Sequence, residues 1–167
     1  DSWNIKGFGV GIERVVEALK SAFPDRTIIQ FDGDSLTSKK AQREALRAYA
    51  EALSPILVGT DLILEYPNLR APLAAIVHLD NMFTHEDYRV PERIWNIVQS
   101  LREHGEQLYI QTFLKEDRIW KHCLTESESS LLQEEREGRR DAHLPPFVHV
   151  IQISSPTVSP IGIRLIR

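Results

Sequence analysis

Two small residues, Gly59 and Thr60, follow the short apolar run Pro-Ile-Leu-Val at residues 55–58. Buried parallel strands often end in such a loop, and open α/β sheets bind ligands at the carboxyl ends of their strands. The Thr60 hydroxyl and the backbone beside Gly59 can donate hydrogen bonds to a phosphate group. These two residues are therefore our first candidates for binding an anion.

A second candidate is the glycine cluster Gly7-Phe-Gly-Val-Gly11, which stands directly before a predicted helix. Glycines allow a ligand to approach the backbone, and the start of a helix offers free N–H groups. Asp32, after the next predicted strand, lies where an acidic ribose ligand would be expected in a nucleotide-binding unit. The G-x-G-x-G spacing differs from G-x-G-x-x-G, and residues 1–6 are short and polar for a buried strand. A nucleotide-cofactor or methyltransferase-like unit is therefore kept as a lower alternative.

Basic residues form one helical stripe next to Asp32, which is typical of a solvated helix face and also suits phosphate. They are Lys39, Lys40, Arg43 and Arg47. The net charge of −4 indicates no overall basic footprint, so any nucleic-acid binding has to come from a local patch of this kind.

Other catalytic patterns are missing from the 167 residues. No Walker A lysine motif, Ser-His-Asp order or zinc-protease helix occurs, so we expect no enzyme activity from this segment alone. His122 and Cys123 are helix neighbours that point in different directions, and Cys123 is expected in the core. A single cysteine favours a reducing, cytoplasmic setting and argues against a metal site within the segment. No apolar run is long enough to span a membrane.

Apolar periodicity predicts the elements that position these residues. Helices are expected at 12–23, from Ser38 to about Leu53, at 87–102, around Ile119, and at 126–140; strands are expected at 26–32, 55–59, 73–79 and 107–113. Short apolar strands alternating with helices favour an α/β fold with a mostly parallel sheet and helices on both faces. Pro145-Pro146 breaks the pattern, and residues 147–153 are expected to begin a further strand. The chain starts without Met, and we expect it to be a segment of a longer protein.

Several stretches resemble, in order, the PriA family of primosomal replication-restart helicases. "GVGIERVVEAL" (9–19) resembles the family's G-x-G-T-E-R-V-x-E-x-L, and "FPDRTIIQFDGDSLTSKKA" (23–41) its D-x-D-[ST] stretch. "ILVGTDLILEYPNL" (56–69) resembles helicase motif V, and "HLDNMFTHEDYRVPERIWNIVQSL" (78–101) the block that follows it. "LYIQTF" resembles the strand after motif VI, and "EEREGRRDAHLPPFVHV" (134–150) the block before the C-terminal domain.

The resemblance implies a RecA-like second helicase lobe (P-loop NTPase type) over residues 1–143 and the start of a truncated C-terminal domain over 144–167. It implies that Gly59, Thr60, Gly11 and Arg14 contact DNA backbone, with Lys39 and Lys40 behind them. The implied partners are single-stranded or forked DNA, the upstream ATP-binding lobe and zinc-binding insertion of the parent chain, and other primosome or single-strand-binding proteins. The family is an ATP-dependent DNA helicase that uses ATP and Mg²⁺.

The departures from the family pattern concern the motor. Motif V is about three residues shorter than in the family and lacks Ala-Lys-Gly-His. Motif VI, Q-V-A-G-R-A-G-R in the family, is replaced by Ser-Leu-Arg-Glu-His at residues 100–104, which leads directly into the strand. Arg102 is the one remnant of the arginines that would reach an ATP phosphate. Ile12 replaces the family's Thr, and the second aspartate after Asp80 is missing.

We therefore predict a DNA-binding lobe of a replication-restart or repair protein without a competent ATPase, because an arginine finger contributes about 10³–10⁵ in rate. The alternative, which the negative net charge favours, is a non-catalytic lobe that scaffolds primosome partners.

Overall fold

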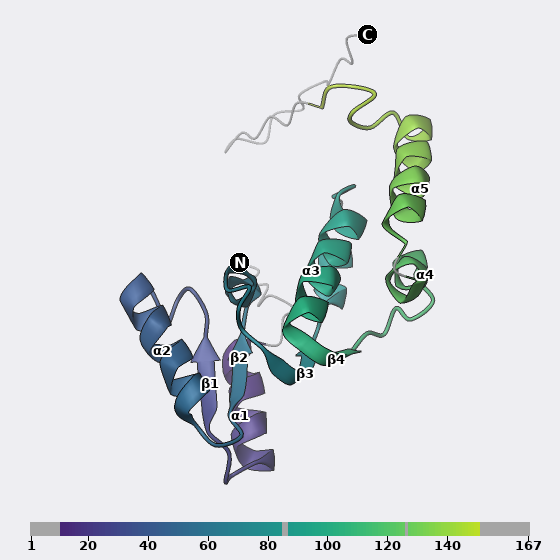
Figure 1. Ribbon diagram of the computed structural model, residues 1–167. Helices are drawn as coiled ribbons and strands as arrows, with labels where there is room; N and C mark the ends of the chain where they lie inside the picture. Colours follow the sequence, from purple (N-terminus) through teal and green to yellow (C-terminus); the bar gives the residue numbers. More distant parts are fainter. Residues whose placement is uncertain (1–10, 85–86, 126, 151–167) are drawn as a thin grey trace, which may run out of the picture. The chain divides into compact units, whose positions relative to one another are not determined.

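The computed structural model of the chain describes residues 11–84, 87–125 and 127–150, which form a mixed α/β arrangement of helices and short parallel sheets (Figure 1). The chain divides into two compact units, Asp1–Glu126 and Ser127–Arg167. All the candidate phosphate-binding residues lie in the first unit. No helix among the described residues is long and apolar enough to span a membrane.

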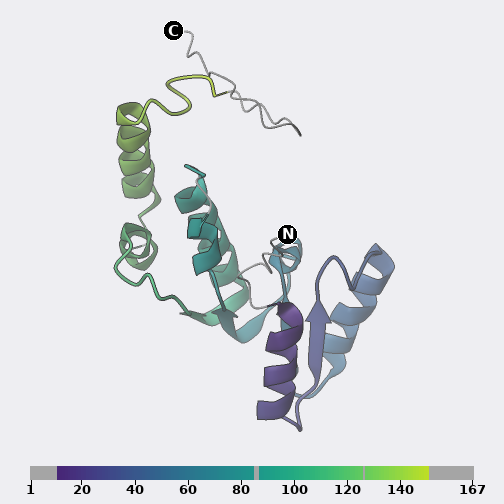
Figure 2. The same cartoon turned by 180° about the vertical axis from the view of Figure 1, so that it is seen from behind.

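The first unit begins with a parallel strand pair. Helix α1 (Ile12–Ala22) leads into β1 (Ile28–Phe31), and α2 (Lys39–Glu51) connects β1 to β2 (Ile56–Gly59). The strands pair in parallel register from Ile28 opposite Ile56 to Phe31 opposite Gly59. Helices α1 and α2 pack on opposite sides of this pair (Figures 1 and 2). Both helices run antiparallel to the strands, so they begin at the carboxyl ends of β1 and β2.

A second parallel pair follows in the same unit. The 3₁₀ helix η1 (Asp61–Glu65) precedes β3 (Ala71–Ile76), and the 3₁₀ helix η2 (Asp80–Thr84) precedes α3 (Val90–His104). Strand β4 (Gly105–Ile110) begins directly after α3 and pairs with β3, and α4 (Arg118–Thr125) follows. Pro91 stands in the first turn of α3, where its missing N–H costs no helical hydrogen bond.

The core of this part lies between α3, α4 and one face of the β3–β4 pair. Its buried side chains are Ile76, Leu79, Val90, Ile94, Trp95, Val98, Ile119, Trp120 and Cys123, which confirms the predicted core position of Cys123. The other face of the pair is open, since Leu73 is 53% and Tyr109 58% exposed. Parallel sheets are usually covered on both faces, so this open face is unusual.

The helices and strands lie within a few residues of their predicted positions, and both strand pairs are parallel as expected. The described strands form two separate two-stranded sheets, not one continuous sheet. Periodicity identifies strands but does not say which neighbours pair, which is why this feature was not predictable. The expected end of the second helix at about Leu53 is two residues too late, because α2 ends at Glu51 and Leu53 is 91% exposed.

In the second unit the described residues contain α5 (Glu128–Asp141), close to the predicted helix 126–140. Residues 147–150 of the predicted strand 147–153 are not in a strand, and the others lie outside the described residues. The two units divide at residue 126. The predicted domain change at residue 144 rests on the Pro145-Pro146 break in the pattern and on the family resemblance, and it stays a prediction.

Candidate nucleic-acid interface

The predicted phosphate-binding residues come together at the carboxyl ends of β1 and β2. Three helical segments begin there: α1 after Gly11, α2 after Ser38 and η1 after Thr60. The start of an α-helix bears a partial positive charge. We call this surface the β1–β2 edge and define it by Gly11, Arg14, Lys39, Lys40, Gly59 and Thr60. Whether it binds DNA stays a prediction.

Gly59 lies where no side chain fits. A Cβ added to it would clash with the backbone carbonyl of Phe31 and lie 2.6 Å from the Ile63 side chain. The next amide, Thr60 N, donates to the Phe31 carbonyl at 3.4 Å. The Thr60 hydroxyl accepts from Leu62 N at 3.5 Å and can still donate its own proton. Close contact with β1 thus explains why residue 59 is a glycine, and it fixes the position of the exposed Thr60.

Gly11 is the N-cap of α1 and has no side chain to bond to the free amides of the first turn. Its carbonyl accepts from Arg14 N at 3.0 Å, which places Arg14 at the third position of the helix, in its first turn and exposed to solvent. A Cβ on Gly11 would lie 2.8 Å from a carboxylate oxygen of Glu13, so an acidic group already lies beside this helix start. Gly7 and Gly9 lie outside the described residues.

Lys39 and Lys40 open α2 after Ser38, whose hydroxyl accepts from Ala41 N at 3.1 Å as a helix cap. The Lys39 ammonium contacts the Glu65 carboxylate at 2.7 Å, and that hydrogen bond raises the Lys39 pKa above its ordinary value. Lys40 lies 4.0 Å from Glu44 and is the more exposed of the two lysines. Both ammonium groups face solvent, and Lys39 is already paired with an anion.

Asp32 is buried and shapes the turn after β1. Its Oδ1 accepts from the amides of Asp34 and Ser35 at 3.0 and 2.9 Å, and its Oδ2 accepts from Gln30 Nε2 at 2.8 Å. Burial would raise the Asp32 pKa, but these hydrogen bonds outweigh it and hold the pKa below its ordinary value. A ribose hydroxyl would have to replace these bonds, which weakens the nucleotide-cofactor alternative.

Tyr66 is the residue at this edge that sequence reasoning missed. Its ring packs edge-to-face on Phe31 at 5.4 Å, and its hydroxyl donates to Gln42 Oε1 at 2.5 Å. Its carbonyl lies 3.2 Å from His104 Nε2, at the end of α3. Tyr66 therefore joins β1, α2 and α3 to η1. An aromatic residue directly before Pro67 was the available signal, but nothing in the spacing named its partners.

Arg102 lies apart from these residues, in the α3–α4 layer. Its Nη2 donates to the Cys123 carbonyl at 2.6 Å and so joins α3 to α4. Helix α3 ends at His104 and β4 starts at Gly105, so the helix runs into the strand without an intervening loop. The sequence predicted this direct transition.

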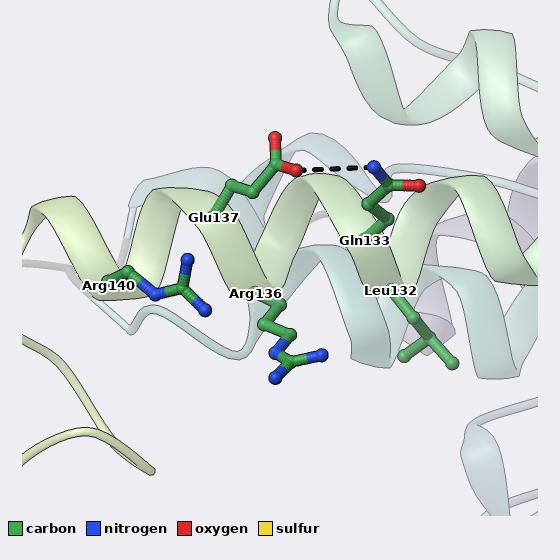
Figure 3. A pocket seen from close by; sticks show the side chains of 5 residues that line it. All are labelled: Leu132, Gln133, Arg136, Glu137 and Arg140. Atoms are coloured by element: carbon green, nitrogen blue, oxygen red, sulfur yellow. Dashed lines mark hydrogen bonds between the residues drawn. The ribbon is translucent and has the colours of Figure 1, made fainter.

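The second unit has a shallow hollow on α5, which Figure 3 shows from close by. Its lining residues are Leu132, Gln133, Arg136, Glu137 and Arg140. Gln133 Nε2 donates to Glu137 at 3.2 Å, and the Arg140 guanidinium lies 5.1 Å from the centre of the Phe147 ring. Because the hollow combines two guanidinium groups with a carboxylate, its charge does not clearly favour an anion.

Comparison with known proteins confirms the predicted resemblance. The replication restart protein PriA of Chlamydia pneumoniae is 29% identical over 152 residues, which are 86% of this chain and 20% of that protein. Bacillus subtilis PriA is 26% identical over 162 residues, 92% of this chain and 20% of that protein. Thermotoga maritima PriA is 31% identical over 162 residues, 92% of this chain and 22% of that protein.

The chain therefore spans about a fifth of the length of the curated relatives it matches. No protein-family model matches it. Similarity to a replication restart protein thus extends over most of this chain but over a small part of each relative.

Proposed function

We propose that this chain is a RecA-like lobe that binds single-stranded or forked DNA within a cytoplasmic replication-restart protein. The observation that supports this most is the β1–β2 edge. Six residues chosen from the sequence come from three separate segments and lie at one end of one strand pair. Phosphate contacts from Arg14, Lys39 and Lys40, with a hydroxyl at Thr60, would hold the DNA backbone without reading its sequence.

We also propose that this lobe does not support efficient ATP-driven translocation. In a helicase, a glycine-rich loop before the strand at β4 would present arginines to the ATP phosphates. Here α3 continues to His104 and Gly105 already belongs to β4, while the Arg102 guanidinium bonds to the Cys123 carbonyl. No loop is left to close on a phosphate. Hydrolysis of ATP by the full-length parent protein, measured with and without DNA, tests this proposal, and efficient DNA-stimulated turnover would contradict it.

Fluorescence anisotropy with labelled single-stranded and forked DNA, across a salt series, tests the DNA-binding proposal. The Arg14→Ala/Thr60→Ala variant should bind at least about fivefold more weakly, since two lost hydrogen bonds at roughly 0.5–1.5 kcal/mol each amount to at least about 1 kcal/mol. The matched control is Arg26→Ala/Thr27→Ala at the opposite end of β1, which should bind like the parent chain. Binding that is insensitive to both salt and the edge substitutions would contradict the proposal.

The second candidate function is a scaffold that docks a primosome protein. The open face of the β3–β4 pair, with Leu73 and Tyr109 exposed, and the net charge of −4 favour this alternative. A Leu73→Lys substitution would then abolish partner binding and leave DNA binding unchanged. Failure of DNA binding in the anisotropy series would make this the preferred function.

A further inference from the structure

Glu65 pairs with Lys39, one of the two lysines at the β1–β2 edge. Its Oε2 lies 2.7 Å from Lys39 Nζ, and the two side chains are 57% and 65% exposed. The Lys39 pKa is raised, first by this hydrogen bond and also by the charge of Glu65. Glu65 is the last residue of η1, the segment that Thr60 caps. The carboxylate that pairs with Lys39 therefore belongs to the same short segment as the candidate phosphate donor.

The position of Lys39 does not depend on Glu65 alone. Its ammonium lies 5.6 Å from the centre of the Tyr66 ring, a distance at which an aromatic ring attracts a cation. The ring is itself fixed by the contact with Phe31 and by the hydroxyl bond to Gln42. Helix α2 fixes the backbone of Lys39 through the Ser38 cap. The ammonium would therefore stay at this edge if the carboxylate were removed.

We propose that Glu65 is a built-in competitor for phosphate, and that a nucleic-acid phosphate binds Lys39 by replacing the Glu65 carboxylate. This inference rests on the proposed DNA-binding function and adds to it. Exposed ion pairs contribute little stability, so the exchange is easy in either direction. Replacing Glu65 leaves its carboxylate to be neutralised by salt cations, so a phosphate bound at Lys39 gives a smaller net release of counterions than one bound at a lysine without an acidic partner. The ion pair between Glu65 and Lys39 thus lowers the affinity of the β1–β2 edge for phosphate but does not prevent binding.

The test is the Glu65→Gln variant in the full 167-residue chain. It should bind single-stranded DNA about two- to fivefold more tightly, the range that an exposed ion pair allows. Its plot of log affinity against log salt should be steeper by up to about 0.7, the value for one phosphate neutralised on a single strand, because no displaced carboxylate then takes up a salt cation. Adding Lys39→Gln to Glu65→Gln should remove the whole gain.

Glu51→Gln is the matched control. Glu51 pairs with Arg47 at 2.7 Å, so this substitution makes the same charge change and also frees a cation, but at the other end of α2. It should produce less than half of the affinity gain of Glu65→Gln. If the chain binds DNA, equal affinity gains in the two variants, or no gain in Glu65→Gln, would overturn the proposal.

Inorganic phosphate separates this inference from the proposed function. The NMR signals of the Lys39 side chain should shift with added phosphate more strongly in Glu65→Gln than in the parent chain. If no variant binds DNA but this difference is seen, the competition stands and the DNA-binding proposal fails. If the Lys39 signals respond equally in both chains, Glu65 does not compete, whatever the DNA results.

Discussion

At the scale of single residues, Asp80 joins the ends of the second strand pair. It follows β3, and its carboxylate accepts from Thr112 Oγ1 at 2.5 Å and from Phe113 N at 2.7 Å, both after β4. The hydrogen bond from the Phe113 backbone amide contributes most to holding the Asp80 pKa below its ordinary value, and the bond from the Thr112 hydroxyl adds to this effect. The ionised carboxylate is thus part of what keeps β3 beside β4.

This geometry predicts a pH-dependent contribution to stability. An unfolded chain has an Asp pKa of about 3.9, and the folded value is lower. Asp80 therefore stabilises the fold fully above that unfolded value, and the contribution is lost as the pH falls through the folded pKa. Asp80→Asn should cost about 1 kcal/mol at pH 7 and less at about pH 3, which lies below the unfolded value. Urea unfolding of the parent chain and the variant at both pH values measures this cost, and substitution of the exposed Asp25 by Asn is the control. Equal costs of Asp80→Asn at the two pH values would contradict the prediction.

Gly59 allows a second prediction at this scale. Gly59→Ala would push a methyl group into the Phe31 carbonyl and the Ile63 side chain. Overpacking of this kind costs about 1–3 kcal/mol, and the strain should displace Thr60 and weaken DNA binding. Gly33→Ala is the control, because a Cβ there meets nothing within 4 Å. Urea unfolding followed by circular dichroism gives both values, and similar stabilities for the two variants would show that β2 moves aside without cost.

At the scale of elements, α3 organises the part of the first unit that contains the second strand pair. Ile94 is 0% exposed at its centre, whereas Leu73 on the open face of β3 is 53% exposed. Ile94→Ala should therefore cost about 2–4 kcal/mol, and Leu73→Ala less than about 1 kcal/mol. Thermal and urea unfolding check both values. A large loss at Leu73 would mean that this face is covered in solution, by a second copy of the chain or by another part of it.

Much of this element level could be predicted from the sequence. Apolar spacing identified the four strands found among the described residues and placed the ends of α1 and α2 within two residues, and Ser38 marked the start of α2. Local patterns do not contain long-range partners, however, which is why two results were unexpected. The split into two strand pairs depends on which strands meet, and the contacts of Tyr66 with Phe31, Gln42 and His104 join segments 24 to 38 residues apart.

The candidate site was predictable for a different reason. Gly59, Thr60 and Gly11 lie at element ends, and parallel βα units place such ends at one edge. Charge pairing was not predictable. The ion pair between Lys39 and Glu65 spans 26 residues and depends on how η1 folds back toward α2. Sequence reasoning therefore found the basic residues but not the acidic group that pairs with one of them.

At the scale of the whole molecule, the net charge of −4 opposes DNA binding, so the position of the positive charges has to decide it. Two double variants make the same change in net charge at different places. Lys39→Gln/Lys40→Gln removes the β1–β2 edge lysines, and Arg136→Gln/Arg140→Gln removes the α5 arginines of Figure 3. Each lowers the net charge by two, from −4 to −6.

If the edge is the interface, the lysine variant should bind single-stranded DNA with a shallower slope of log affinity against log salt. The slope should fall by up to about 1.4, the value for two phosphate contacts. The arginine variant should change it by less than half as much. Anisotropy titrations at four or more salt concentrations measure both slopes. Equal reductions of the slope in the two variants would mean that overall charge governs binding. A larger reduction in the arginine variant would mean that the interface lies on α5. A predominant lysine effect would show that a few cations at one strand-pair edge bind DNA in a chain that is acidic as a whole.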